Sequence, residues 1–468
     1  MKQIILIIAS VLFSILFFEK SIGLNLSIFT VITIAVLAFY NPKKFRKKAV
    51  IVHSILYLLT AILVFIQHSN LAIIANCFAF FTVIGAFGDH KTSLYIQWLN
   101  GIFTAIAGFF YRNFEVDNTA EKVKRKKDID VLHLVKLIGI PLVFIILFVL
   151  LYKNGNPLFN NLVNTISFKF VNIQWLLFSV LGYFLFSNIS KPILVEPATT
   201  SDHHIGNELI KSETFSEEPL KKETQLGVTL LGMLNLLIVL YMITDVAYLL
   251  STETKLAADL SKQVHNGIYT LIASIVIAII IILYVFRGNL NFYRNNKRLK
   301  HLTYLWICLN VVLITLIAIK NQDYILSFGL TYKRIGVHVY IFLTLIGLIT
   351  TFLKVMNIKN LAFLFRVNTQ IAFVILIALS SINWDRSITK FNIRNVKNFD
   401  VDYLIKLSNQ NAIMLHNAKQ QIAVSQTTYN RIDNKYRSHL KDLENRKWQE
   451  YSYETYQYQQ QSLNSRSK

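Results

Sequence analysis

Ionisable side chains are rare inside the apolar segments of this 468-residue sequence, and the few that occur are the first candidates for chemistry. A charged group is costly within a lipid bilayer, so a residue that carries one there is a functional candidate by default. Asp245, in the segment MITDVAYLL, could bind a cation or a proton, or could pair with Arg334 or His265. The alternative is a carboxylate in the wet interfacial layer that orients the end of a helix.

Motifs that specify a reaction are absent from the sequence. His203 and His204 are adjacent but lack companion ligands at the spacing that a zinc site needs. The chain has only Cys77 and Cys308, both within apolar segments, so no disulfide framework is implied. We therefore predict no catalytic residue, no metal and no cofactor, and the sequence favours a protein that is not an enzyme.

Twelve apolar segments, most of them close to the length that crosses a bilayer, must position the candidate residues. Hydrophobic residues make up 54% of the chain, charged residues 16%, and the mean hydropathy is +0.45. A hydrocarbon core of about 30 Å needs roughly 20 helical residues, and the alternation typical of a membrane barrel is absent. We predict an all-α, polytopic integral membrane helical bundle of 11 or 12 transmembrane helices with a mostly helical soluble C-terminal tail. The segments are 4–18, 26–40, 49–66, 71–88, 94–111, 132–152, 173–186, 228–249, 267–286, 303–319, 337–353 and 369–382.

The formal charge of +22 orients the chain in a membrane, and we expect no nucleic-acid partner. Much of the basic excess lies in short segments beside apolar runs, where it meets anionic lipid head groups. In the later half, one alternate set of connecting segments carries 18 Lys and Arg residues and the other set carries 7. The positive-inside rule makes the first set cytoplasmic. We therefore predict a multi-pass protein of the bacterial plasma (inner) membrane with an extracytoplasmic C-terminal tail.

The front of the chain conflicts with this rule. Residues 41–48 (NPKKFRKK) and 122–127 (KVKRKK) are both basic, yet three apolar runs separate them. Three crossings would place the two basic clusters on opposite sides of the membrane. Either one of the three runs does not span, or one cluster lies outside, and the sequence leaves both alternatives open.

Hydrophilic segments divide the chain into four parts. We predict an N-terminal transmembrane bundle at 1–111 and a charged cytoplasmic linker at 112–130. A second transmembrane bundle follows at 131–382, interrupted by a polar loop at 191–227, and a soluble tail occupies 383–468. The polar loop has seven acidic and four basic residues and is expected to be poorly ordered.

The tail carries an apolar stripe at helical spacing. We expect this stripe to pack within the tail or to bind a protein partner through a tail helix at 403–445. The Gln- and Tyr-rich end is expected to be disordered after about residue 450. The stripe consists of Tyr429, Ile432, Tyr436, Leu440 and Leu443.

Four segments of the later half resemble a bacterial membrane family catalogued as domain of unknown function 4173. They are RGNLNFYRNN at 287–296, YILSFGLTYKR at 324–334, NWDRSITKFNIRN at 383–395 and FDVDYLIKLS at 399–408. The resemblance covers about residues 130–410; Trp384 and Phe328 depart from the family pattern. It implies the membrane architecture and no reaction. The matching positions are Arg287, Gly288, Asn289, Tyr324, Gly329, Leu330, Thr331, Arg334, Asn383, Asp385, Asn392, Ile393, Arg394, Asp402, Tyr403, Leu404, Leu407 and Ser408.

Three functions compete on this evidence. A structural or regulatory membrane protein, whose water-exposed tail engages partners, is favoured because the sequence has no charged intramembrane pathway. A transporter or lipid-handling protein would need a cavity at mid-depth, lined by Asn235, Asn310 or Asp245. A membrane enzyme on a lipid-linked substrate is the weakest alternative. The candidate functional polar cluster is Asp245, His265, Arg287, Asn289, Tyr324, Thr331, Arg334, Asp385, Asn392 and Arg394.

Overall fold

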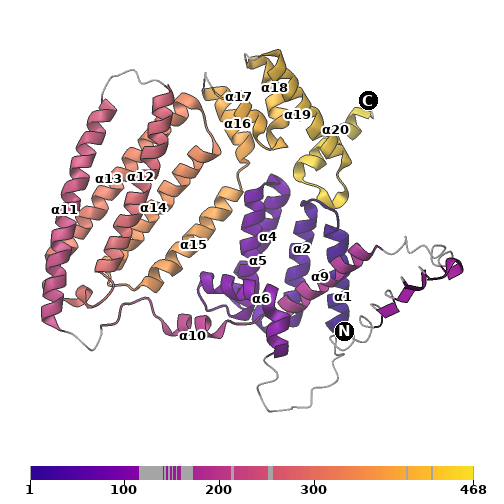
Figure 1. Cartoon of the computed structure of the whole chain (residues 1–468), viewed down its shortest axis with the longest axis horizontal. Coiled ribbons are helices and arrows are strands. Elements are labelled where there is room, and N and C mark those ends of the chain that lie inside the picture. The colour runs from indigo at the N-terminus through magenta and orange to yellow at the C-terminus, as the bar shows by residue number, and fades with distance from the viewer. Residues whose placement is uncertain are drawn as a thin grey trace, which may run out of the picture.

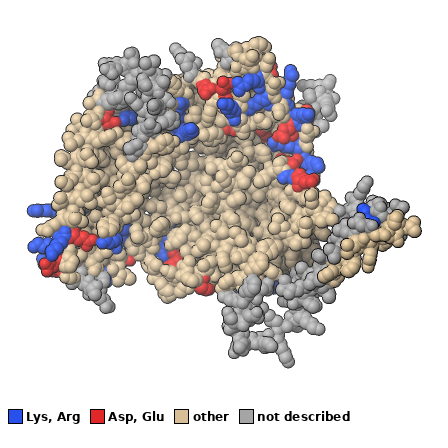
Figure 2. Space-filling model, in the orientation of Figure 1, with Lys and Arg blue, Asp and Glu red and all other residues tan. Residues whose placement is uncertain are grey.

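The computed structural model of the protein consists of helices and their connections, and it describes residues 2–114, parts of 141–159, 172–211, 216–250, 257–396, 399–422 and 425–466. Within these residues, an isolated bridge between Glu208 and Lys359 is the one extended pairing. Seven described helices are long and apolar enough to cross a membrane, and three shorter apolar helices accompany them. Figure 2 shows charged residues gathered toward two ends of the molecule, with a broad band of other residues between them. The protein is membrane-embedded and all-α, and the total of 11 or 12 spans stays a prediction.

The first helical bundle is held together by aromatic side chains. Phe13 of α1 stacks on Phe178 of α9 with ring centroids 5.0 Å apart. Gly182 allows this approach, because a Cβ there would lie 2.8 Å from the Phe13 ring. The helices of the bundle are α1 (Lys2–Phe17), α2 (Leu24–Tyr40), α4 (Lys48–Gln67), α5 (Asn70–Gly88), α6 (Leu94–Phe114) and α9 (Ile173–Ser190), with the short α3 (Pro42–Phe45) between α2 and α4.

The second helical bundle has an aliphatic core and lies on the left of Figure 1. Leu231, Ile282 and Leu348 are fully buried in it. Many large side chains on the outer helix faces are instead exposed, as expected where the surrounding medium is lipid. The helices are α11 (Glu217–Leu250), α12 (Ala257–Val285), α13 (Lys297–Phe328) and α14 (Tyr332–Met356), with the 3-10 turn η3 (Asn289–Phe292) after α12.

The two bundles do not follow the division that the sequence indicated. α15 (Leu361–Ser380) lies between them and contributes Phe373 and Ile377 to the core of the first bundle. α9, which follows the expected linker, also packs in the first bundle. Helices from both parts of the predicted division therefore share the core of the first bundle, because an apolar pattern shows that a helix is buried or lipid-facing without showing which neighbours it packs on.

Each end of the two bundles gathers a distinct set of segments. We call the end that carries α16 to α20 the tail end. The opposite end, which carries the basic segments 41–48, 287–296 and 354–360, is called the loop end (Figure 1). At the loop end, Asn41 donates to the Ser190 carbonyl at 2.9 Å and Lys44 donates to the Gly88 carbonyl at 2.8 Å.

The position of α6 favours one of the two explanations for the conflict between the basic clusters of the front half. It begins beside Ser93, which binds Asp202 of α10 (Glu196–His204), and its last turn carries Arg112, which donates to the Ser187 and Lys191 carbonyls. Both ends of α6 therefore lie at the loop end, and α6 is not one of the seven helices suited to span. This agrees with the alternative that one of the three runs does not cross. Most of the linker 112–130 lies outside the described residues.

The tail forms a small helical domain on top of both bundles. Its core contains Ile388, Leu404, Leu415 and Ile432. The stripe at helical spacing packs within the tail, where Tyr436 stacks on His416 at 4.0 Å. The tail is not one helix over 403–445, and residues expected to be disordered form α20. Its helices are α16 (Trp384–Asn395), α17 (Val401–Lys406), α18 (Ala412–Ala418), α19 (Gln426–Asn445) and α20 (Tyr453–Arg466), with 3-10 turns η4 (Asn409–Asn411), η5 (Lys419–Gln421) and η6 (Trp448–Glu450).

Candidate functional site

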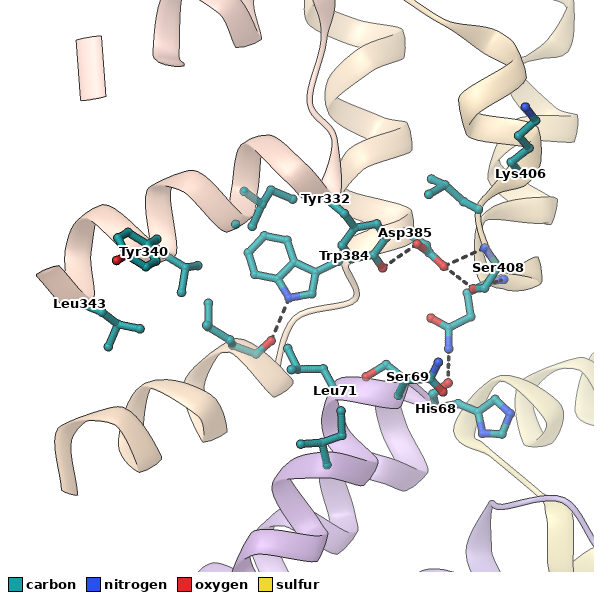
Figure 3. A pocket seen from close by; sticks show the side chains of 18 residues that line it. His68, Ser69, Leu71, Tyr332, Tyr340, Leu343, Trp384, Asp385, Lys406 and Ser408 are labelled. Carbon is teal, nitrogen blue, oxygen red and sulfur yellow. Dashed lines mark hydrogen bonds between the residues drawn. The ribbon is translucent and has the colours of Figure 1, made fainter. Parts of the chain in front are cut away.

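A cavity of about 780 Å³ lies at the tail end, where α5, α14 and α15 meet the tail (Figure 3). Its floor is formed by apolar side chains of the membrane helices, namely Leu71, Ile74, Val339, Leu343 and Leu379. Its roof is polar and comes mainly from the tail, with Asp385, Lys406, Ser408 and Gln410. The cavity therefore has one apolar side and one side that can form hydrogen bonds.

The turn between α13 and α14 is locked to the tail by Asn392. Gly329 has φ +87°, which favours glycine, and a Cβ at this position would lie 2.7 Å from the Asn392 Oδ1 atom. Asn392 accepts from the Leu330 N–H at 2.5 Å and donates to the Leu330 carbonyl at 3.0 Å. Thr331 then caps α14 by accepting from the Arg334 N–H at 3.4 Å. The Gly-Leu-Thr motif and Asn392 are thus two halves of one joint.

Arg334 is committed to the same turn. Its guanidinium carbon lies 3.9 Å from the centroid of the Tyr324 ring, and it donates to the Gly329 carbonyl. Only 9% of the residue is exposed. Because these contacts occupy the guanidinium, Arg334 stabilises the turn and does not face the cavity.

Asp385 joins the start of α14 to the tail. Its carboxylate accepts from the Tyr332 hydroxyl at 2.7 Å, from the Ser408 N–H at 3.2 Å and from the Ser408 hydroxyl. Tyr332 in turn donates its N–H to the Tyr403 hydroxyl at 2.9 Å. The dashed contacts in Figure 3 show Asp385 between Tyr332 and Ser408 at the roof of the cavity.

Gln410 and His68 close the cavity on the side of the first bundle. Gln410 donates to the Gln67 carbonyl at 2.8 Å and to the His68 carbonyl. Burial, assisted by the charge of Arg446, lowers the pKa of His68 to about 4, so the imidazole is neutral at neutral pH. On the opposite wall, Trp384 donates its ring N–H to the Leu379 carbonyl at 3.0 Å.

Lys435 supplies a half-buried positive charge behind the roof. Its ammonium donates to the carbonyls of Leu404, Ile405 and Leu407, where α17 ends. This is the favourable end of a helix for a cation. Burial lowers the pKa of Lys435 to about 8.

The structure brings together five of the ten residues in the predicted polar cluster. Tyr324, Thr331, Arg334, Asp385 and Asn392 form the network just described. Arg287 and Asn289 lie at the loop end, where Arg287 pairs with Glu223 at 3.3 Å. Arg394 lies on α16 and lines a second cavity in the tail. The side chain of His265 lies outside the described residues.

Asp245 does not pair with Arg334, and the side chain of His265, the other partner that the sequence suggested, lies outside the described residues. Its carboxylate forms an ion pair with Lys320 of α13 and accepts from the Tyr241 hydroxyl at 3.4 Å. Lys320 is the first residue after the apolar run at 303–319. The sequence does not show that this position lies beside Asp245, because the two residues are on different helices. The correction is a buried acid–base pair between α11 and α13.

Polar residues at mid-depth belong to helix packing. Asn235 donates to the Leu302 carbonyl of α13 at 3.0 Å, and Asn310 donates to the Trp306 carbonyl of its own helix at 2.7 Å. Neither lines the cavity at the tail end. Within the described part of the chain, no three His, Cys, Asp or Glu side chains group closely enough to hold a metal ion.

Sequence analysis missed several residues of the site. Gln410, His68 and Lys435 carry no motif, and each is significant only because the tail folds back onto the bundles. Lys406 and Ser408 were inside a motif, yet their position above an apolar floor was not visible. A signal was available for Tyr332, which directly follows the Gly-Leu-Thr segment.

Comparison with known proteins identifies a family and no individual relative. A family model described as Domain of unknown function (DUF4153) matches residues 49–418. It is a family of unknown function, as the motifs indicated, but a different one from domain of unknown function 4173. The match begins at residue 49, well before the motif region, and so includes helices of the first bundle. No curated protein and no solved structure matches the chain.

Proposed function

The chain belongs to the DUF4153 family, whose function is unknown, and from that premise we propose that it is a lipid-handling membrane protein that binds an amphiphile beneath its tail. The observation that carries this proposal is the cavity with an apolar floor and a polar roof, placed where the membrane helices end. Its volume of about 780 Å³ falls within the range of about 300–1,000 Å³ that is usual for small-molecule sites.

The two sides of the cavity suit the two parts of an amphiphile. Leu71 and Leu343 offer an acyl chain surroundings as apolar as the bilayer itself, so a chain gains little by entering. Selection must therefore come from the roof. Lys406 is exposed at the rim and Ser408 lies beside it, so a head group that accepts hydrogen bonds would be favoured there.

Filling the floor of the cavity tests the proposal. Gly336 of α14 lines the cavity and a Cβ there would meet no atom within 4 Å, so Gly336→Phe adds a ring at the cavity wall. We expect photo-crosslinking of a diazirine-bearing fatty acid to the purified full chain to fall about tenfold. Gly232→Phe on α11 is the matched control, because its Cβ also meets open space. Equal labelling of the wild type and Gly336→Phe would refute amphiphile binding at this cavity.

A structural or regulatory role has one observation of its own. The tail contacts both bundles, through Gln449 with the Ile15 carbonyl at 3.3 Å and through Asp385 with Tyr332. We propose this as the second candidate, with a protein partner bound on the outer surface of the tail segment 403–445. It is favoured if the fatty acid labels no residue of the cavity while removal of the tail separates the bundles.

For orientation, we propose a bacterial plasma membrane with the loop end in the cytoplasm and the tail outside. The return of α6 supports this, because basic segments 41–48, 287–296 and 354–360 then share one end, where they meet anionic head groups. Asn430→Cys should be labelled in intact cells by an impermeant maleimide, and Lys43→Cys only after permeabilisation, in a background with Cys77 and Cys308 replaced. The reverse pattern contradicts the orientation.

A further inference from the structure

A second cavity, of about 670 Å³, lies within the tail between α16, α18 and α20. Gln410 lines both cavities, and Asp385 and Arg386 are consecutive residues that line the first and the second respectively. α16 and η4 therefore separate the two cavities, and the second has the more polar lining. The second cavity has no part in the amphiphile proposal.

One face of α16 gives the second cavity three cations. Arg386, Lys390 and Arg394 recur at four-residue steps, which places them on the same side of the helix. Arg386 is held by Glu454 of α20 at 2.5 Å and by the Gln410 carbonyl at 3.1 Å. Lys390 and Arg394 are exposed, and no acid pairs with either of them in the described part of the chain.

The one acidic side chain among the residues that line this cavity is already paired with a cation. Glu454 bonds Arg386 and lies 3.4 Å from the buried His439. Burial would raise the pKa of Glu454, but the proximity of His439 and the charge of Arg386 hold it below its usual value. Glu454 therefore neutralises Arg386 and leaves the charges of Lys390 and Arg394 uncompensated.

Amide side chains share the rest of the lining with apolar side chains such as Ile413 and Met414. Asn417, Gln421 and Gln457 all line the cavity from α18, η5 and α20, and they are exposed. Their amides can donate to anionic oxygens and can bind hydroxyl groups. A guanidinium and an ammonium beside such amides match the oxygens of a phosphate, which accepts charge-assisted hydrogen bonds from both.

We propose that this cavity binds the phosphate group of a polar ligand through Lys390 and Arg394, with the amides holding the neighbouring hydroxyl groups. Two sources share this chemistry, a phospholipid head group and a soluble phosphate ester. The lipid source is within reach, because η6 and α20 sit on the ends of α2 and α4, where Glu450 accepts from the Ser21 N–H at 2.8 Å. The proposal is independent of amphiphile binding, since Gly336→Phe leaves this cavity intact.

Charge removal in a matched pair of variants tests the site. Lys390→Gln with Arg394→Gln removes the two uncompensated cations on α16. Arg437→Gln with Lys441→Gln removes two exposed cations at the same four-residue spacing on α19, outside the cavity. The full chain, purified in a non-ionic detergent, is titrated calorimetrically with glycerol phosphate in one arm. In the other arm, native mass spectrometry measures retained phosphatidylglycerol from mixed micelles of phosphatidylcholine and phosphatidylglycerol.

We expect the α16 variant to lose at least tenfold in affinity in one arm, and the α19 variant to bind like the wild type. Loss confined to glycerol phosphate identifies a soluble ester, and loss confined to retained phosphatidylglycerol identifies a lipid head group. Because the contacts are between exposed charges, binding should also weaken as salt is added. Absence of binding in both arms, or equal loss in both variants, overturns the proposal. Circular dichroism confirms that each variant is folded.

Discussion

At the loop end, α6, α10 and α15 meet around one buried carboxylate, whereas at the tail end α5, α14 and α15 meet the tail around a cavity. Asp202 accepts from the Ser93 N–H at 2.7 Å, the Ser93 hydroxyl at 2.8 Å, the Tyr95 hydroxyl at 3.1 Å and Arg366 of α15 at 3.0 Å. Both oxygens of this carboxylate accept hydrogen bonds that serve the fold. At the tail end, Asp385 is equally occupied, but the contacts around it enclose a cavity.

This contrast between the loop end and the tail end indicates where a ligand can bind. A buried charge is tolerated when protein groups satisfy it, and a carboxylate that is so satisfied has no capacity left for a ligand. At the loop end the polar groups hydrogen-bond to one another and hold the segments together. They include residues of the polar loop 191–227, which was expected to be poorly ordered. Among the described residues of the tail end, Lys406 at the rim of one cavity and Lys390 and Arg394 in another have no acidic partner.

The largest expected effect comes from opening the loop end. Asp202→Ala leaves Arg366 without its buried partner and the hydroxyls of Ser93 and Tyr95 without their acceptor. We therefore expect the free energy of unfolding in mixed micelles to fall by about 3 kcal/mol. Glu196→Ala on the same helix should change stability by less than about 0.5 kcal/mol, since its carboxylate bonds only the exposed Thr200. Fatty-acid labelling of the folded variant should persist. Loss of fatty-acid labelling in a fully folded Asp202→Ala variant would mean that the two ends are not independent.

A smaller loss should follow from breaking the roof at the tail end. Asp385→Ala leaves the hydroxyls of Tyr332 and Ser408 without their acceptor, which we expect to cost about 2 kcal/mol and to reduce fatty-acid labelling as well. Asp402→Ala, in the same domain, removes only an exposed ion pair with Arg431 and should cost less than about 1 kcal/mol. Equal stability of the two variants would show that Asp385 does not hold the tail to the start of α14.

The turn above the cavity should be sensitive to a single methyl group. Gly329→Ala forces a side chain into φ +87° and toward the Asn392 amide, so we expect a loss of about 1–2 kcal/mol. Gly288→Ala at the loop end has open space and an ordinary backbone, and it should be nearly neutral. Differential scanning calorimetry compares the pair. A neutral Gly329→Ala would show that the turn tolerates rearrangement.

The smallest expected effect is a pH response of the two ends in two separate pH windows. Burial lowers the folded pKa of Lys435 to about 8 from an ordinary value of 10.5, so the unfolded chain binds more protons between these values. Stability from the tail should therefore rise with pH across this window, and Lys435→Met should flatten the rise in Tm. Burial would raise the pKa of Asp202, but the hydrogen bonds from Ser93 and the charge of Arg366 hold it below its usual value. The loop end should consequently lose stability as pH falls below about 4. A Lys435→Met profile parallel to that of the wild type contradicts the first half of this prediction.

Part of the site could be predicted, because some of its residues act through local chemistry. Gly329 and Thr331 belong to a helix end and the next helix start, which sequence patterns describe well, and Asn392 and Asp385 were named from motifs on the next segment. Lys320 and Gln410 could not be found in this way. The partner of Lys320 lies on another helix, and Gln410 reaches carbonyls that are more than three hundred residues away in the chain.

From the sequence alone, the apolar composition determined that this is an all-α membrane protein, and the helix-end residues determined where several helices begin, since both depend on neighbours along the chain. Only the tertiary structure decided that α6 returns to the loop end, that α9 and α15 pack in the first bundle, and that the tail folds over both bundles. Those outcomes depend on which apolar faces fit together across long sequence separations. The hydrophobic effect that drives burial is not directional and does not by itself select a partner.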